Sequence, residues 1–194
     1  MNRQSFHAMQ VVVKREEKET RLTQFILGEI ASGRVSLTGQ WCVVALSLES
    51  PVVAALRRVV NDLGGASGLR IHAVLTRSGR HTIGTGFDVI ETLAVRTAEN
   101  SRLLDAHEQL VLGSASSWTG DCMRRDPRER DAFETFGSNN VELANWAMKS
   151  FERIWVGAQP LNGRIIGAGQ DALDRLVVGD ESRLKGVVAA TSRH

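Results

Sequence analysis

The chain has 194 residues, of which 42% are hydrophobic and 24% are charged, and its formal net charge is +2. This length fits one folded domain with an arm or a tail, and the composition is that of a soluble globular protein. A net charge this close to zero gives no global support for nucleic-acid binding, so that role would need a local basic patch.

Targeting and redox features point to the cytoplasm. Residues 1–15 are polar and lack the apolar core of a signal peptide. No apolar run approaches the roughly 20 residues that a helix needs to cross a bilayer. Cys42 and Cys122 have neither metal-ligand spacing nor a disulfide framework, which is typical of free thiols in a reducing compartment. We therefore expect a cytoplasmic protein of bacterial type without a membrane span.

The first half of the chain alternates between strand-like and helical patterns. Val11–Val13 is a candidate short strand, and apolar residues at helical spacing predict a helix over 14–32. Apolar runs then predict buried strands over 41–48 and 70–76, with a helix between them that begins at Ser50-Pro51. Such a strand–helix–strand unit makes a parallel pair with a right-handed crossover.

The second half is predicted to add more strands and a long closing helix. The predicted elements are a short helix over 87–92, strands over 93–97, 104–112, 116–123 and 131–136, a helix over 141–155 capped by Asn139 or Asn140, and a weak helix over 171–178. We expect an α/β fold with a mixed β-sheet flanked by helices. Its parts are an N-terminal arm and helix (1–40), an α/β domain (41–157) and a C-terminal appendage (158–194).

A lone histidine and an arginine-rich loop are the features that carry chemistry. His107 lies at the start of a predicted strand, and Arg124, Arg125, Arg128 and Arg130 follow the next strand. Taken alone, His107 is either a hydrogen-bonded structural residue or part of a site. The other histidines do not cluster at metal-ligand spacing, so we expect neither a metal nor another cofactor.

The order of elements over residues 25–157 resembles one half of the phospholipase D superfamily, and specifically its short, single-motif bacterial nucleases. The motif of that superfamily reads H-x-K-x(4)-D-x(6)-G-S-x-N. His107 and Gly120 match its histidine and its first glycine, with a spacing that is one residue short. The positions of the lysine, aspartate, serine and asparagine hold Gln109, Ser114, Asp121 and Met123.

The resemblance implies a site at His107, Gln109 and Asp121, and Glu134 would orient the histidine if the glutamate is counted from Gly120. Counting back from the last helix gives Glu129 instead. In the family, the histidine attacks phosphorus, cationic and polar residues hold the phosphate, and two half-sites meet across a two-fold axis. The resemblance therefore implies a homodimer through the His107 face and a phosphate-containing ligand.

The substitutions argue against the family reaction. Gln109 removes a positive charge and Asp121 adds a negative one, and each charge is worth about 4 kcal/mol at 4 Å with an effective dielectric near 20. That outweighs retained hydrogen bonds of about 1.5–3 kcal/mol each. We therefore expect a degenerate motif in a non-catalytic or regulatory binding protein.

Two other interpretations stay open. In the first, Arg124 or Arg125 replaces the missing lysine, and the protein is a divergent phosphodiesterase, nuclease or phosphatidyl transferase with His107 as nucleophile. Against it, the loop arginines can simply pair with neighbouring acidic residues on a solvated surface. In the second, the chain is an unrelated α/β adaptor for another protein.

Overall fold

The computed structural model describes residues 7–64, 68–77, 92–98 and 106–161. These residues form one mixed sheet with the strand order β1-β7-β6-β5-β2-β3-β4-β8. β2, β3 and β4 run parallel, whereas β1, β5, β6 and β7 form an antiparallel half that joins them at β2–β5. The strands are β1 (His7–Val13), β2 (Gln40–Ala45), β3 (Arg70–Leu75), β4 (Thr92–Thr97), β5 (His107–Leu112), β6 (Ser117–Cys122), β7 (Ala132–Ser138) and β8 (Gln159–Pro160).

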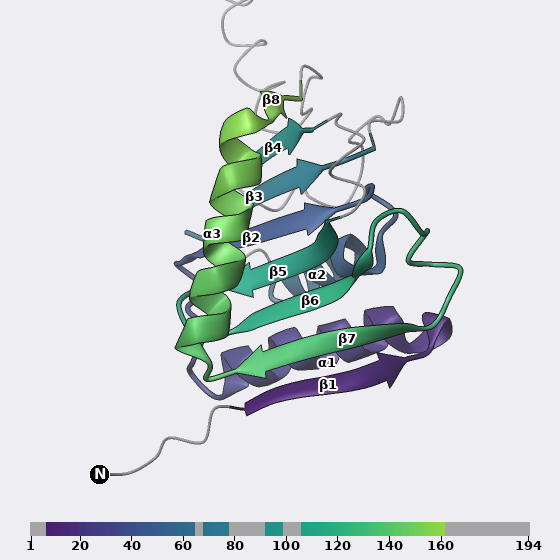
Figure 1. The fold of residues 1–194 in the computed structure, drawn as a ribbon. Helices are drawn as coiled ribbons and strands as arrows, with labels where there is room; N and C mark the ends of the chain where they lie inside the picture. The colour runs from purple at the N-terminus through teal and green to yellow at the C-terminus, as the bar shows by residue number, and fades with distance from the viewer. Residues whose placement is uncertain (1–6, 65–67, 78–91, 99–105, 162–194) are drawn as a thin grey trace, which may run out of the picture.

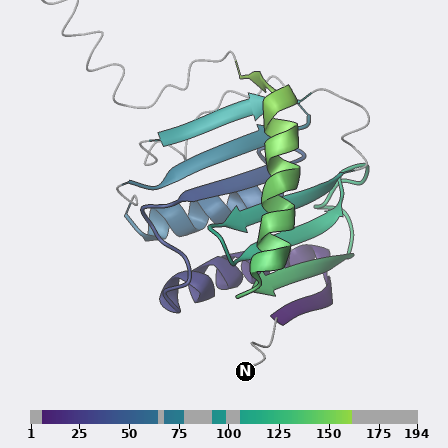
Figure 2. The same cartoon turned by 60° about the vertical axis from the view of Figure 1, so that its left-hand side comes forward.

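Three α-helices cover the two faces of this sheet, which confirms the predicted mixed sheet flanked by helices. α1 (Lys18–Ala31), preceded by a 3-10 turn η1 (Arg15–Glu17), and α2 (Pro51–Asp62) lie on one face, and α3 (Val141–Gly157) crosses the other (Figures 1 and 2). Asn140 is the cap of α3, because its side-chain oxygen accepts a 3.0 Å hydrogen bond from the Leu143 amide. None of the described helices is long and apolar enough to cross a membrane.

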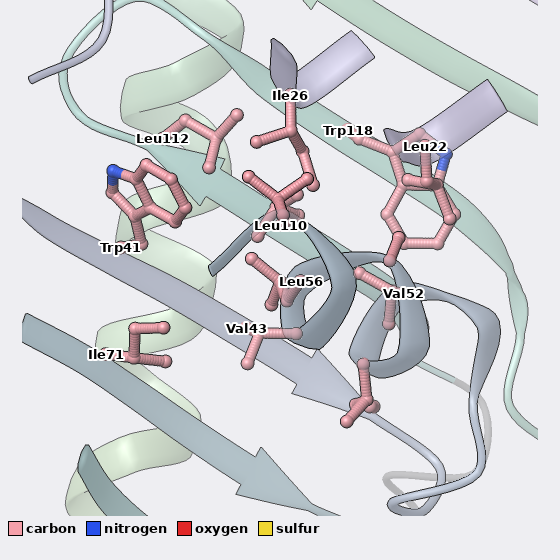
Figure 3. Close-up of a cluster of buried hydrophobic side chains, with 14 of the residues drawn as sticks. Leu22, Ile26, Trp41, Val43, Val52, Leu56, Ile71, Leu110, Leu112 and Trp118 are labelled. Carbon is pink, nitrogen blue, oxygen red and sulfur yellow. The ribbon is translucent and has the colours of Figure 1, made fainter. Parts of the chain in front are cut away.

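The main core lies between the sheet and the pair α1 and α2. Ile26 of α1 lies near Leu110 and Leu112 of β5, Leu22 of α1 lies beside Trp118 of β6, and Leu56 of α2 belongs to the same cluster (Figure 3). Burying each such side chain stabilises the fold by about 1.5–3 kcal/mol. A smaller cluster under α3 includes Cys42, Val44, Val111, Ala147 and Phe151. Both faces of the central strands are therefore dry, which explains their continuous apolar runs.

The N-terminal strand is longer than its sequence signal. Only Val11–Val13 has a strand-like pattern, yet β1 begins at His7 and pairs along its whole length with β7. Met9 and Val12 are exposed, so β1 lacks the continuous apolar run of a central strand. Residues 7–31 share one sheet and one core with the segment 41–157 that we expected to form the α/β domain.

Parts of three predicted elements lie outside the described residues, namely most of the short helix over 87–92, the start of the strand over 104–112 and the weak helix over 171–178. The beginning of the expected C-terminal appendage is described. There, β8 pairs with the edge of β4, and the Leu161 amide donates a 3.1 Å hydrogen bond to the Val95 carbonyl.

The position of α3 decides which part of the sheet stays open. In Figure 1 the helix crosses the strands near the carboxyl ends of β5 and β7. The opposite end of the same face holds the start of β5, the end of β6, the start of β7 and the end of β1, and the helix does not cover it. This open end carries His107.

Candidate functional site

A cleft of about 330 Å³ lies at the open end of the sheet. It brings together residues that are far apart in the sequence, because β5, β6, β7 and β1 are neighbours there. The side chains that define it are His107 of β5, Asp121 of β6, Phe133 of β7, Val12 of β1, and Arg125 and Arg130 of the β6–β7 loop.

His107 is exposed, and among the described residues one hydrogen bond holds its ring. Its Nδ1 lies 2.7 Å from the carbonyl oxygen of Gly120. A carbonyl oxygen can only accept, so Nδ1 carries the proton and Nε2 is the acceptor of the neutral ring. The fixed tautomer makes Nε2 a group that could accept a proton, attack an electrophile or, once protonated, donate to an anion.

The contact with Gly120 occurs at an irregularity in the sheet. Gln109 pairs with Thr119, but His107 pairs with Cys122, so β6 holds one residue more than β5 over this stretch. Such a bulge takes a residue out of the regular ladder and is frequent beside functional sites. Here the extra residue lies within the Gly120–Asp121 step, where the carbonyl turns to the imidazole.

Asp121 lies in the cleft with both carboxylate oxygens engaged. Oδ1 accepts a 2.8 Å hydrogen bond from the Cys122 amide, and Oδ2 is 3.4 Å from Nε of Arg130. The negative charge that we expected at the serine position of the motif is thus in the cleft beside His107, and Arg130 balances it. Sequence reasoning did not single out Arg130.

Gln109 differs from His107 in its surroundings. It is only 4% exposed and does not line the cleft, and its Nε2 has no hydrogen-bond partner within the described residues. A flexible cation at this position could reach toward a ligand, but this neutral amide is buried and does not line the cleft. Among the four catalytic positions implied by the resemblance, the structure brings His107 and Asp121 together in the cleft.

Glu134 lies on the opposite face of the sheet, so it does not orient His107 through a direct hydrogen bond as the resemblance implies. Its carboxylate accepts a 2.9 Å hydrogen bond from the indole nitrogen of Trp118 and lies 3.8 Å from the Lys18 ammonium. Burial raises the pKa of Glu134 to about 7, against the lowering effects of Trp118 and Lys18. The alternative Glu129 is exposed in the loop, and the group that orients His107 is the Gly120 carbonyl.

The loop arginines divide into paired residues and one that faces the cleft. Arg128 binds Asp126 through two hydrogen bonds of 2.9 and 2.5 Å, which lower the pKa of Asp126 to about 2. Arg130 pairs with Asp121. Arg125, and not Arg124, lines the cleft. Within the described part of the chain, the Arg125 guanidinium has no carboxylate at ion-pair distance.

Several cleft residues gave no signal in the sequence. Gln10 and Val12 reach the cleft through β1, and Asp131 and Phe133 reach it at the start of β7. A strand signal predicts that a strand forms but not its partner, so the sequence could not place β1 beside β7. Over the described ranges, no group of three histidine, cysteine, aspartate or glutamate side chains has the arrangement of a metal site.

The chain was compared with known families, curated proteins and solved structures. No family model matches it, and neither does any curated protein. Nuc from Salmonella typhimurium, a phospholipase D family member, superposes with a TM-score of 0.54 at 14% identity, covering 81% of this chain and 100% of Nuc. NucT from Helicobacter pylori gives 0.55 at 12% identity, again covering 81% of this chain and 100% of NucT.

TrmBL2, an archaeal chromatin protein whose structure shows a mode of DNA binding, gives a TM-score of 0.53 at 7% identity. The match covers 81% of this chain and 56% of TrmBL2. These identities are too low to transfer an activity, and the superpositions show a shared fold alone. The chain has the phospholipase D-like α/β fold.

Proposed function

We propose that this protein is a phospholipase D-like binding or regulatory protein whose His107 cleft holds a phosphate-containing ligand without cleaving it. One observation carries the proposal: a carboxylate, Asp121, lies in the cleft beside His107 and is already paired with Arg130. Covalent attack on phosphorus needs preplaced positive charge around the phosphoryl oxygens. Asp121 opposes that charge, and the buried Gln109 does not supply it.

Binding a phosphate group requires less preplaced positive charge in this cleft than covalent attack on phosphorus does. The Arg125 guanidinium can form a bidentate pair with phosphate, and protonated His107 can donate from Nε2. A neutral pocket wall of Val12 and Phe133 would contact an organic part of the ligand.

The test combines binding and turnover. Inorganic phosphate and a phosphate diester are titrated into isotope-labelled protein, and the amide shifts of the cleft residues are followed by NMR. Arg125→Ala should weaken binding roughly tenfold or more, since a hydrogen-bonded ion contributes about 1.5–3 kcal/mol. Arg58→Ala, an exposed arginine of α2, is the matched control and should leave binding unchanged.

The same preparations are assayed for hydrolysis of an activated phosphate diester. The proposal expects wild type and His107→Ala to be equally inactive. Turnover by the wild type that disappears in His107→Ala would overturn it.

We also propose that a second copy faces the cleft, as the resemblance implies. Val12 is 53% exposed and Phe133 is 68% exposed, and both lie on the open part of the sheet face. Light scattering after gel filtration tests this. Phe133→Glu should give a monomer, whereas Val156→Glu, a change at an exposed residue of α3, should leave the oligomeric state of the wild type unchanged. A monomeric wild type would end the dimer proposal.

One observation favours a second candidate, a divergent phosphodiesterase, nuclease or phosphatidyl transferase. The bond from Nδ1 to Gly120 leaves the lone pair of Nε2 directed away from the protein backbone, as a nucleophile requires. In this reaction Nε2 would form a bond to phosphorus as the bond from phosphorus to the leaving oxygen breaks, and that oxygen would take a proton from solvent. Water or an acceptor hydroxyl would then displace the histidine from phosphorus and give its proton to solvent, while Arg125 would balance charge on the phosphoryl oxygens. The hydrolysis assay separates the two functions, since this one loses activity in both His107→Ala and Arg125→Ala.

A further inference from the structure

The geometry points to Trp118, Glu134 and Lys18 as positioning residues that hold His107 from the opposite face of the sheet. The inference rests on the His107 cleft of the proposed function, but it concerns the state of the imidazole and not the ligand. It assigns a role to a buried polar cluster that the cleft does not otherwise explain.

The first link is the bond between His107 and Gly120. The carbonyl of Gly120 is the described partner of Nδ1, and the bulge at Gly120–Asp121 sets its direction. His107 is exposed, so few neighbours hold its ring in place. A small displacement of the Gly120 peptide would therefore lengthen this bond and release the proton to either ring nitrogen.

The second link is the contact between Gly120 and Trp118. The indole folds along β6 and lies against the Gly120 backbone, because a Cβ atom placed on Gly120 would come within 2.6 Å of two atoms of the six-membered ring. Close packing of this kind restricts movement of the Gly120 peptide. Glycine is needed here for space, since any side chain would displace either the strand or the indole.

The third link holds the indole itself. The Nε1–H of Trp118 donates to Oε2 of Glu134 at 2.9 Å, and Trp118 is only 2% exposed. The bond sets the rotation of the indole about its side-chain torsions, and a buried indole N–H without a partner is unfavourable. The orientation of the indole ring that lies against Gly120 thus depends on the carboxyl group of Glu134.

The last link joins the strands to α1. Oε1 of Glu134 lies 3.8 Å from the Lys18 ammonium, and both side chains are at most 2% exposed. Lys18 begins α1, so the helix and β7 together fix the carboxyl group. The chain Lys18, Glu134, Trp118, Gly120 and His107 crosses the sheet from the buried face to the open one.

A purely structural role makes a different prediction. If the cluster only filled the core, its variants would lower stability and leave the His107 imidazole as it is. A readout of the ring nitrogens therefore separates positioning from packing.

The experiment measures the Nδ1 and Nε2 chemical shifts of His107 in protein labelled with ¹⁵N-histidine, at a pH where the ring is neutral. The wild type should show one tautomer, with the proton on Nδ1. Trp118→Phe and Glu134→Leu should lose it and show averaged shifts. Glu134→Gln keeps an acceptor for the indole and should retain the tautomer of the wild type. Ile26→Val, a core change outside the chain of contacts, is the control and should also retain it.

Unchanged His107 shifts in Trp118→Phe would overturn the inference, as would averaged shifts in Ile26→Val. Should Glu134→Leu fail to fold, Trp118→Phe against Glu134→Gln still decides. A failure of the proposed function would give a different result, because the absence of phosphate binding does not change the His107 tautomer in the ligand-free protein.

Discussion

Among the buried carboxylates of the described residues, Glu29 and Glu134 differ most clearly in their surroundings although both are buried. Glu29 is 2% exposed and Glu134 is 1% exposed. Glu29 accepts two 2.9 Å bonds from Arg34, one of 2.6 Å from Ser138 and another from Ser116. Burial alone would raise the pKa of Glu29, but these bonds lower it. Glu134 has one indole donor and a lysine at 3.8 Å, and burial raises its pKa to about 7.

The difference teaches that burial does not decide the charge of a carboxyl group. The number and quality of its donors decide it, because each bond to the ionised form offsets part of the desolvation cost. Glu29 is an anion whose hydrogen bonds join α1 to Ser116 just before β6 and to Ser138 of β7. Glu134 has fewer hydrogen-bond donors than Glu29. It accepts a bond from Trp118, whose indole lies against Gly120 of the candidate site.

Replacing Glu29 should have the largest effect. Glu29→Ala leaves the hydroxyls of Ser116 and Ser138 without their acceptor and Arg34 without its partner. Each hydrogen bond to the ionised carboxylate contributes about 1.5–3 kcal/mol, so losing all four, two of them to the exposed Arg34, should lower the free energy of unfolding by at least about 3 kcal/mol. Urea unfolding at pH 7 measures it. Glu19→Ala, an exposed change on the same helix, should stay within about 0.5 kcal/mol of the wild type. Equal effects of the two variants would refute the comparison.

Replacing Glu134 should change the pH dependence of stability. Its pKa is about 7 in the folded protein against 4.5 unfolded, so the folded state binds the proton more tightly and stability falls as pH rises between these values. Such a shift is worth about 3 kcal/mol. Glu134→Gln should remove this decline and be the more stable protein at pH 8. Urea unfolding from pH 4.5 to pH 8 is the measurement, and parallel profiles for the two proteins would contradict the expectation.

Removing a single hydrogen-bond donor should make Glu29 more like Glu134, a buried carboxyl group with few donors. Ser138→Ala deletes the 2.6 Å bond to Oε1. A hydrogen bond to a charged group contributes about 1.5–3 kcal/mol, and the pKa of Glu29 should rise. Urea unfolding gives the first quantity, and NMR titration of the Glu29 carboxyl carbon gives the second. Ser114→Ala in the exposed β5–β6 turn should change neither.

The exposed ion pair of Asp126 and Arg128 should contribute the smallest stabilisation. It is the reference for the three substitutions at buried or partly buried residues. The Asp126 carboxylate is held by Arg128, whose side chain is 49% exposed, and the pKa of Asp126 is lowered to about 2. Its stabilisation is present above pH 3.8 and is lost as pH falls through 2. Solvent limits it to less than about 1 kcal/mol. Asp126→Asn should therefore differ slightly from the wild type at pH 6 and converge with it at pH 2. A loss as large as that of Glu29→Ala would remove the distinction between buried and exposed carboxylates.

Much of the fold could be predicted from periodicity. The strands and helices with strong apolar patterns lie where expected, and Asn140 is one of the two predicted caps of α3. β1 was the weakest prediction, since Met9 and Val12 face solvent and only its pairing with β7 holds it in the sheet. A strand stabilised mainly by a distant partner leaves little trace in its own sequence.

The site could be predicted only in part, because the sequence does not reveal which face of the sheet each strand residue points to. In β7, Phe133 is exposed and Glu134 is buried, which inverts the usual order of apolar and charged side chains. A slip of one residue moves every side chain to the other face, and nothing in the local sequence reveals the bulge at Gly120–Asp121. His107, Asp121 and Arg125 were placed together because they stay close to the motif along the chain. The roles of Gln109 and Glu134 depended on contacts between distant strands.

The pairing of β1 with β7 has a consequence for the order in which the molecule can assemble. Synthesis proceeds from the N-terminus at roughly 5–20 residues per second, so β1 and α1 leave the ribosome well before β7 exists. Until Ser116 and Ser138 have been made, Glu29 lacks two of its partners and Met9 has no neighbouring strand. Contacts so distant in sequence slow folding, because the intervening loop must close first. β1 therefore cannot take its place in the sheet until β7 has been synthesised, although β1 precedes β7 by more than 100 residues along the chain.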